Sequence, residues 1–316
     1  MTMRPMAQGS LSRAISASDL RRAALAALLA TTALSPVAAQ DLPTGGQVVQ
    51  GGVDIATPGP GQMTVTQSTQ SGVINWQGFS IGQGNAVEFR QPSSDAATLN
   101  RVTGPVGSRI DGSLSANGQV YLVNPNGIVV GPSGRVETGS FAASTLDISD
   151  EDFTTGRLRF SGDGRSATVE NHGSIRTADG GFAALLGGKV VNTGTISAPL
   201  GKIALGAGEQ ATLDLYGDEF LQIALPSEGE DGETVIDQRG TVSADGGRIE
   251  IKAATARDAA RRIVNLSGVT EARSVSGRDG MIVLGGGSGG TVRMQGTVRT
   301  APAQRTPSAL LVETRH

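Results

Sequence analysis

The chain has 316 residues, of which 46 are glycine, while aromatic residues make up only 3%. This composition is unusual for a layered globular fold and favours a single elongated domain. Basic residues (26) nearly balance acidic ones (29) and are scattered without aromatic neighbours, which argues against nucleic-acid binding. The absence of cysteine excludes disulfides, thiolate nucleophiles and cysteine-ligated metal sites.

Residues 1–39 have the pattern of a secretory signal peptide. Arginines precede an apolar run at residues 23–30, and small residues follow up to an expected cleavage site between Ala39 and Gln40. Arg21 and Arg22 lack the flanking residues of a twin-arginine signal. The apolar run is too short to span a bilayer, and no later run of about 18 apolar residues occurs. The sequence therefore predicts export to the periplasm and no transmembrane segment after cleavage.

Short alternating runs of apolar and polar residues predict β-strands separated by turns. They lie at residues 63–67, 72–81, 86–90, 98–102 and 108–114. Trp76 lies among branched and aromatic residues, which indicates a core or end-cap position rather than a ligand-stacking platform. The best helix candidate is residues 253–264, where the composition favours a helix but the β-rich surroundings favour a strand equally.

Two further apolar runs meet at a turn made of Asn124, Pro125, Asn126 and Gly127. Pro125 fixes its own φ and favours an extended Asn124, and an Asn-Gly pair readily takes positive φ. Asparagine side chains in turns also bond nearby backbone groups. The sequence predicts that the chain reverses here, and both a structural turn and a partner-recognition site are compatible with this pattern.

An internal repeat begins at Gly173. Each copy has a glycine, a hydroxyl residue, a β-branched residue, a small turn and a strand, with copies at Gly173, Gly194 and Gly240 and looser ones at 268 and 296. The first spacing, 194 − 173 = 21 residues, predicts one coil of a solenoid. The second, 240 − 194 = 46, predicts about two coils and includes an acidic run at residues 228–233, interpreted as a solvated loop rather than a cation site.

Such units cannot bury their apolar side alone, so they must stack. In a parallel β-helix, small and branched side chains fill a narrow interior, which matches the scarcity of large rings. Asn171 and Asn192, each two residues before its repeat glycine, are expected to form a ladder. A calcium-binding β-roll is set aside, because the glycine run at residues 285–290 lacks the aspartate of that repeat.

Residues 74–225 resemble the secretion domain, also called the haemagglutination activity domain, of filamentous haemagglutinin-like exoproteins. These are the exported members of two-partner secretion systems. The resemblance is carried by an Asn-Pro-Asn-Gly-Ile motif at residues 124–128 and by the segment at 140–148, which ends in Ser-Thr-Leu-Asp-Ile. Residues 74–76, 79–82 and 99–102 match in the right order. The upstream Asn-Pro-Asn-Leu motif of many members is missing, and known members tend to be much longer.

The resemblance implies an all-β fold: a right-handed parallel β-helix (solenoid) with an N-terminal β cap and extra-helical hairpins. It implies four regions: residues 1–39 as signal peptide, 40–225 as two-partner secretion domain, 226–300 as further coils with an acidic loop, and 301–316 as a tail. It assigns partner recognition to Asn124, Pro125, Asn126, Gly127 and Ile128. Supporting family positions are Asn100, Arg101, Ser144, Thr145, Leu146 and Asp147.

The resemblance also implies the partners. A dedicated outer-membrane barrel transporter with POTRA domains is expected to export the chain from the periplasm of a Gram-negative bacterium. The product is expected to be secreted or held at the cell surface, with an adhesin-like or haemagglutinin-like role and a host-cell or surface glycan receptor. Neither a cofactor nor an enzymatic activity is expected.

A β-helical carbohydrate-active enzyme is the alternative. Asp147, Asp150, Glu151 and Asp152 form an acidic cluster that could supply the acid and base of a polysaccharide hydrolase. Asp147, however, lies in the family-like segment, and the other three are expected to form a solvated loop. The only histidines are His172 and His316; they lack metal-ligand spacing, and His172 is expected at a surface turn.

Overall fold

The computed structural model describes residues 42–165, 167–217, 219–224, 234–254, 262–275, 278–286, 291–300 and 309–313. The chain divides into two units, residues 1–39 and 40–316, and every described residue lies in the second. The expected signal peptide, the acidic run at 228–233 and residues 255–261 of the helix candidate lie outside the described residues. Ala253 ends one strand and Arg262 begins another, so a helix over the whole of 253–264 is wrong.

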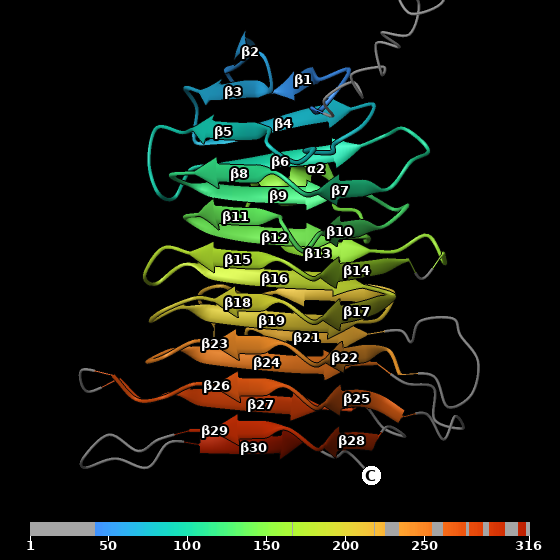
Figure 1. Cartoon of the computed structure of the whole chain (residues 1–316), viewed down its shortest axis with the longest axis vertical. Coiled ribbons are helices and arrows are strands. Elements are labelled where there is room, and N and C mark those ends of the chain that lie inside the picture. The colour runs from blue at the N-terminus through green and yellow to red at the C-terminus, as the bar shows by residue number, and fades with distance from the viewer. Residues whose placement is uncertain are drawn as a thin grey trace, which may run out of the picture. The chain divides into compact units, whose positions relative to one another are not determined.

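Three sheets wind around a common core, and successive coils stack in chain order (Figure 1). Sheet 1 contains β1 (Gln47–Gln50), β4 (Ser71–Trp76), β6 (Ala97–Val102), β9 (Gln119–Val123), β12 (Ser140–Ser144), β16 (Phe182–Gly187), β19 (Lys202–Ala207), β24 (Arg248–Ala253), β27 (Met281–Gly285) and β30 (Ala309–Glu313). Sheet 2 contains β7 (Ser108–Ile110), β10 (Ile128–Val130), β14 (Thr168–Asn171), β17 (Lys189–Asn192), β22 (Ile236–Gln238), β25 (Arg262–Leu266) and β28 (Thr291–Met294). Sheet 3 contains β2 (Val53–Gly59), β3 (Gln62–Gln67), β5 (Ala86–Arg90), β8 (Ser113–Ala116), β11 (Arg135–Thr138), β15 (Ser174–Thr177), β18 (Thr195–Ser197), β23 (Thr241–Ser243), β26 (Val269–Glu271) and β29 (Thr297–Arg299).

The pairing within these sheets is parallel except at the N-terminal end. There β1 pairs antiparallel with β4, and β2 pairs antiparallel with β3, which forms the expected cap. Outside the coils lie a short helix, α2 (Asp150–Thr154), and an antiparallel sheet 4 made of β13 (Leu158–Ser161), β20 (Gln210–Leu213) and β21 (Leu221–Ala224). The expected parallel β-helix with a cap and extra-helical hairpins is confirmed. None of the described helices is both long and apolar enough to cross a membrane.

Each full coil runs from sheet 2 to sheet 3 to sheet 1, and we name the connections corner 2–3, corner 3–1 and corner 1–2. Ser174 pairs with Thr195, so the 21-residue repeat is one coil, as predicted. Thr195 pairs directly with Thr241, so the 46-residue spacing is also one coil, and the prediction of about two coils is wrong. The additional residues leave the stack at corner 1–2, where they include β20 and β21 of sheet 4.

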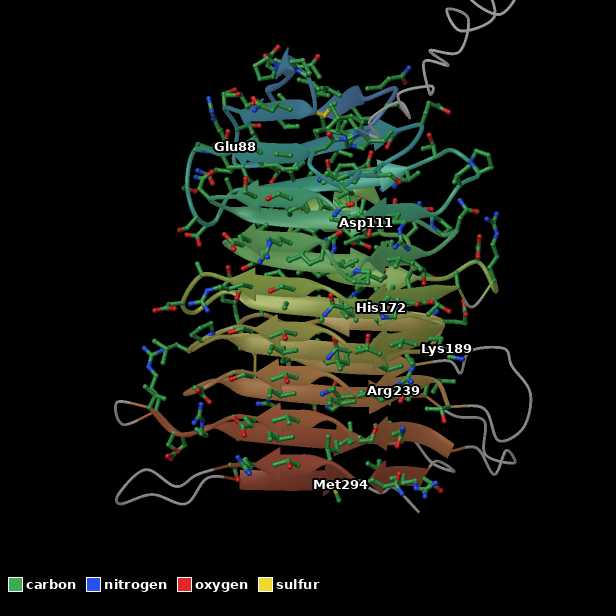
Figure 2. All side chains as sticks on the ribbon, in the orientation of Figure 1. Glu88, Asp111, His172, Lys189, Arg239 and Met294 are labelled. Carbon is green, nitrogen blue, oxygen red and sulfur yellow. The ribbon has the colours of Figure 1, made fainter. Side chains whose placement is uncertain are left out.

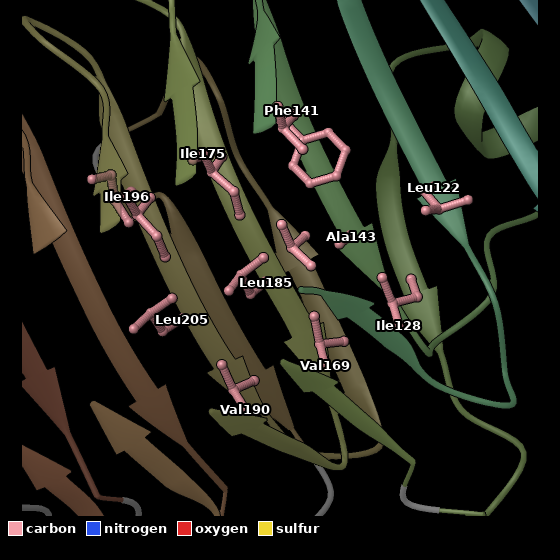
Figure 3. Close-up of a cluster of buried hydrophobic side chains, with 14 of the residues drawn as sticks. Leu122, Ile128, Phe141, Ala143, Val169, Ile175, Leu185, Val190, Ile196 and Leu205 are labelled. Carbon is pink, nitrogen blue, oxygen red and sulfur yellow. The ribbon is translucent and has the colours of Figure 1, made fainter. Parts of the chain in front are cut away.

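The interior of the coils is filled by columns of branched and small side chains (Figure 3). In sheet 2, Ile128 lies beside Val169, and Val169 beside Val190, all fully buried. Neighbouring parallel strands are about 4.8 Å apart, so these columns remove apolar surface from water continuously along the stack. This packing explains why the sequence prefers Val, Ile, Leu and Ala over large rings.

The interior also holds Phe89 and Phe141, and further large rings form two groups. Trp76 is buried at the N-terminal end, edge-on to Phe79 at 5.6 Å, and its indole Nε1 donates to Asn100 Oδ1 at 3.0 Å, so the expected core position is confirmed. Tyr121 on the outer face of sheet 1 packs against Phe153 of α2 and Phe182 of β16 at 5.2 and 5.9 Å. This second apolar cluster attaches α2 and sheet 4 to the coils.

Buried amides run along corner 2–3. Asn171 Nδ2 donates to Asn192 Oδ1 at 2.8 Å, which confirms the predicted ladder. Asn192 Nδ2 then donates to Gln238 Oε1 at 2.6 Å, so a glutamine extends the ladder to a third coil. The repeat glycines stack beside it: a Cβ placed on Gly194 would lie 2.1 Å from the carbonyl oxygen of Gly173. Only glycine permits the coils to approach so closely at this corner.

Candidate functional site

The motif at residues 124–128 forms corner 1–2 between β9 and β10. Gly127 N donates to Asn124 O at 3.1 Å and Gly127 has φ 108°, as expected for a turn with glycine in the left-handed region. Asn124 Oδ1 accepts from the backbone N–H of Asn126 at 2.9 Å. However, β9 belongs to sheet 1 and β10 to sheet 2, so the predicted reversal between two strands is wrong. The turn is a corner of the coil, because each flanking strand pairs with other coils.

Asn124 is fully buried and joins three stretches of chain. Its Nδ2 donates to the carbonyl oxygen of Val106 at 3.0 Å and to Ser108 Oγ at 2.9 Å. Its backbone N–H donates to Ser144 O in the next coil at 2.9 Å. An unsatisfied buried amide costs about 1–3 kcal/mol, so these bonds fix the corner against both adjacent coils.

Asn126 is exposed and lies at the tip of the corner. Its Nδ2 donates to Gly104 O at 3.0 Å and to Asn124 Oδ1 at 3.2 Å, and its Oδ1 accepts from an Arg165 guanidinium N–H at 3.0 Å. The two motif asparagines therefore hold the segment at residues 103–107, which we call the 103–107 loop. The sequence shows this loop only as a Gly- and Pro-containing turn directly after the Leu-Asn-Arg-Val match.

Arg101 of β6 ties the corner to the following insertion. Its guanidinium pairs with Asp147 and Asp150, both at 2.8 Å, and donates to Ile148 O at 2.5 Å. Only 15% of its side chain is exposed. Burial acts to lower the pKa of Arg101, but the bonds to the two carboxylates outweigh it and the pKa is raised. Arg101 therefore stays charged and holds the start of α2 against sheet 1.

The other supporting positions lie inside the fold. Asn100 is buried, accepts from Trp76 and donates to Tyr121 O at 3.2 Å. Ser144 Oγ bonds both the N–H and the carbonyl oxygen of Leu146, and Thr145 Oγ1 donates to Ala167 O at 3.2 Å. These side chains shape the backbone around the corner but offer little surface to a partner.

The structure brings part of the predicted set together at the surface. A groove of about 430 Å³ is lined by Arg101, residues 102–105, Pro125, Asn126, Asp147 and Arg165. A second groove, on the other side of the 103–107 loop, is lined by residues 107–109, 126, 127, 129, 167, 168 and 170. The corner thus separates two depressions, and the loop forms a ridge between them. Arg165 is a member that sequence reasoning missed, since it lies 39 residues after Asn126.

The acidic residues after Asp147 form the first turn of α2, which corrects the expected solvated loop. Ser149 caps the helix, with its side chain accepting from Asp152 N at 3.1 Å. Arg157 pairs with Glu151 and Asp152, and the bond from Arg157 lowers the pKa of Asp152. The general acid of a glycosidase needs a raised pKa, so this pairing gives no support to polysaccharide hydrolysis.

His172 lies at the outside of the stack (Figure 2). Its ring nitrogens lie 2.7 Å from Glu170 Oε2 and 2.6 Å from Thr193 Oγ1, so it connects neighbouring coils at corner 2–3. Across the described part of the chain, no three Asp, Glu or His side chains gather in a way that could hold a metal ion.

Comparisons with known proteins identify the family of this chain. A family profile described as the TPS secretion domain, where TPS denotes two-partner secretion, matches residues 39–300. Two proteins named heme/hemopexin-binding protein, both from Haemophilus influenzae, are 36% and 30% identical over 262 and 267 residues. The aligned regions cover 80% and 77% of this chain but 28% of each relative, so the chain spans less than a third of their length.

Two solved structures share the fold. The HMW1 secretion domain from Haemophilus influenzae is 28% identical with a TM-score of 0.66, covering 86% of this chain and 82% of that one. The filamentous hemagglutinin secretion domain is 16% identical with a TM-score of 0.52, covering 86% and 99%. The family match extends beyond residues 74–225, where the motifs lie, into the later coils. The chain belongs to the TPS secretion domain family, the β-helical export domains of exoproteins that Gram-negative bacteria secrete through a cognate outer-membrane transporter.

Proposed function

We propose that this chain is the export region of an exoprotein that POTRA domains of its transporter recognise in the periplasm. Residues 1–39, which have the pattern of a signal peptide, deliver the chain there and are removed before Gln40. Residues 40–225 serve as the secretion domain and residues 226–300 as further coils. Each coil that folds outside the cell buries more apolar surface, which biases the chain against return without ATP at the outer membrane.

The recognition site in this proposal is the corner at residues 124–128, and the supporting positions act by shaping the backbone around it. The observation that carries the proposal is that the two asparagines of the motif differ in burial and in contacts. Asn124 is buried and fixes the corner through bonds to Val106, Ser108 and Ser144, whereas Asn126 is exposed between two grooves. A fixed and partly exposed corner suits recognition, because little conformational entropy is lost when a partner binds.

For the exoprotein as a whole we propose a binding role rather than catalysis, with an adhesin-like contact to a host-cell or surface glycan receptor. The curated relatives are named for binding heme or hemopexin, and the acidic residues of α2 are paired with arginines. Both points support a binding protein over a glycan-cleaving enzyme.

The test is secretion of the full chain in cells with and without the cognate transporter. We expect extracellular protein only with the transporter, and a mature N-terminus at Gln40. Export that does not depend on the transporter would overturn the proposal. The control is the amount of periplasmic protein in transporter-free cells, measured for wild type and for Asn126→Ala. Equal amounts show that a lower extracellular yield of the variant reflects lost export and not degradation of the chain.

A further inference from the structure

The 103–107 loop is held at both ends and at two of its carbonyl oxygens, and its tip is exposed. Thr103 N donates to Trp76 O at 2.8 Å, and Ser108 N donates to Gly127 O at 2.9 Å, so both ends are anchored. Between them the amides of Asn124 and Asn126 take the carbonyl oxygens of Val106 and Gly104. The bonds from Asn124 and Asn126 use only backbone atoms of the loop and leave the Val106 side chain exposed, whereas Thr103 Oγ1 donates to Trp76 O at 3.0 Å.

Val106 is 69% exposed at this tip. The exposed large apolar side chains among the described residues are Val48, Val49, Val106, Tyr216, Val275 and Met294. A single exposed valine is ordinary in a soluble protein. Val106 differs from the others in its setting, because it belongs to the loop that the two motif asparagines hold and its backbone is fixed on the ridge between two grooves.

Most of the charged groups around this ridge are paired within the chain. Arg165 pairs with Asp163 in the first groove, where Arg101 pairs with Asp147. In the second groove, Arg109 pairs with Asp111 and Glu170 with His172. A partner therefore meets an exposed apolar tip whose charged neighbours are mostly paired, and such a tip can serve as an interface anchor that fills an apolar pocket.

We propose that the Val106 side chain inserts into an apolar pocket of the transporter's periplasmic domain, and that Asn124 and Asn126 act by presenting it. The proposal rests on the proposed function, since it names the contact by which that transporter reads the corner. Pro105 restricts the loop before the tip, so presenting Val106 costs little entropy on binding.

The test compares Val106→Asp with Tyr216→Asp in the full chain, coexpressed with the cognate transporter. Tyr216 is 96% exposed and lies in the region of sheet 4, so it is a matched control for placing a charge on an exposed apolar site. We expect Val106→Asp to lower extracellular yield by about tenfold or more. The free-energy cost of burying a carboxylate in an apolar pocket exceeds the ~1.4 kcal/mol that corresponds to a tenfold change in binding. Tyr216→Asp is expected to leave the yield unchanged.

Photocrosslinking from position 106 provides the second measurement. A photoreactive residue at position 106 is expected to give an adduct with the transporter, whereas one at position 216 is not. Transporter-dependent secretion that Val106→Asp leaves unchanged, with no adduct at 106, overturns this inference alone. Secretion that is independent of the transporter overturns the proposed function instead, so the two failures are distinguishable. Unchanged protease resistance of the purified Val106→Asp protein is the control for folding.

Discussion

Two corners of the β-helix use buried asparagine and neighbouring glycine in different ways. At corner 2–3, Asn171 bonds to Asn192 and Asn192 to Gln238, so each coil repeats the contact of the last. At corner 1–2, Asn124 bonds to the backbone of Val106 and to Ser108 Oγ, which belong to a loop and the strand that follows it. The same amide chemistry gives a ladder where its neighbours repeat and a particular shape where they do not.

This difference between the two corners explains where on the β-helix a partner can recognise the chain. Corner 2–3 is short and alike in successive coils, so any surface it offers is offered several times. Corner 1–2 carries the 103–107 loop, the motif, and the insertions that contain α2 and sheet 4. A partner that must find one place on a repetitive stack can do so only where the stack is irregular.

The largest expected effect is at the glycine column of corner 2–3. In Gly194→Val, the added side chain meets the carbonyl oxygen of Gly173 at 2.1 Å, and the contact is with backbone that cannot rotate away. We expect a loss of stability above the ~1–3 kcal/mol typical of overpacked side chains, measured by urea unfolding. Gly59→Ala is the control, since its Cβ meets only Gln62 Oε1 at 3.8 Å and is expected to be nearly neutral. Equal stability of the two variants would show that the coils are not closely stacked here.

The next largest expected loss of stability is at the amide ladder of corner 2–3. Asn192→Ala leaves Gln238 Oε1 without its partner and leaves Asn171 Nδ2 with only the 3.3 Å bond to Thr195 O, and both side chains are fully buried. Loss of two buried partners is expected to cost about 2–4 kcal/mol in the same unfolding measurement. Asn265→Ala, which removes a partly exposed bond to Asp237, is expected to cost less than about 1 kcal/mol. A small effect at Asn192 would mean that water replaces the ladder.

A smaller effect is expected at the support of corner 1–2. Arg101→Gln removes the ion pairs to Asp147 and Asp150, whose side chains are 51% and 37% exposed. Solvent weakens such pairs, so we expect about 1–2 kcal/mol. Amide hydrogen exchange should accelerate at residues 147–155 while the ladder keeps its protection. Arg90→Gln, which breaks an exposed pair with Glu88, is the control, and equal acceleration in the ladder would remove the distinction between the corners.

The smallest effect concerns α2 and its pH dependence. The bond from Arg157 lowers the folded-state pKa of Asp152, so its stabilisation is present above the unfolded pKa and is lost as pH falls through the lowered value. We expect Arg157→Gln to raise the pKa of Asp152 in an NMR titration. The variant is expected to be less stable than wild type at neutral pH and equally stable in strong acid. A pKa of Asp152 that does not move in the variant would remove Arg157 as its cause.

The sequence predicted the regular coils of the β-helix, but the insertions that leave the coils were missed. The Gly173 and Gly194 copies are close enough in sequence to give the coil length and the Asn171–Asn192 ladder. The 46-residue spacing misled because an insertion that leaves the stack has the length of another coil. Ser149, three residues before Asp152, was a capping signal that could have predicted α2.

At the motif, sequence reasoning gave the turn but not its setting. Apolar runs on both sides of residues 124–127 fit a hairpin and a solenoid corner equally, because both strands alternate in the same way. The contacts of Asn124 and Asn126 reach back to Gly104 and Val106 and forward to Arg165. No local sequence pattern predicts these contacts, because they follow from the stacking of whole coils.

The placement of recognition at corner 1–2 is tested most directly by comparing Asn124→Ala with Asn192→Ala. The measurement is extracellular yield with the cognate transporter, plotted against the unfolding free energy of the same purified variant. Both variants lose bonds of a fully buried amide, but only Asn124 holds the 103–107 loop. We predict that Asn124→Ala is exported less than Asn192→Ala at equal or smaller loss of stability. Yields that follow stability alone for both variants would contradict a recognition site at this corner.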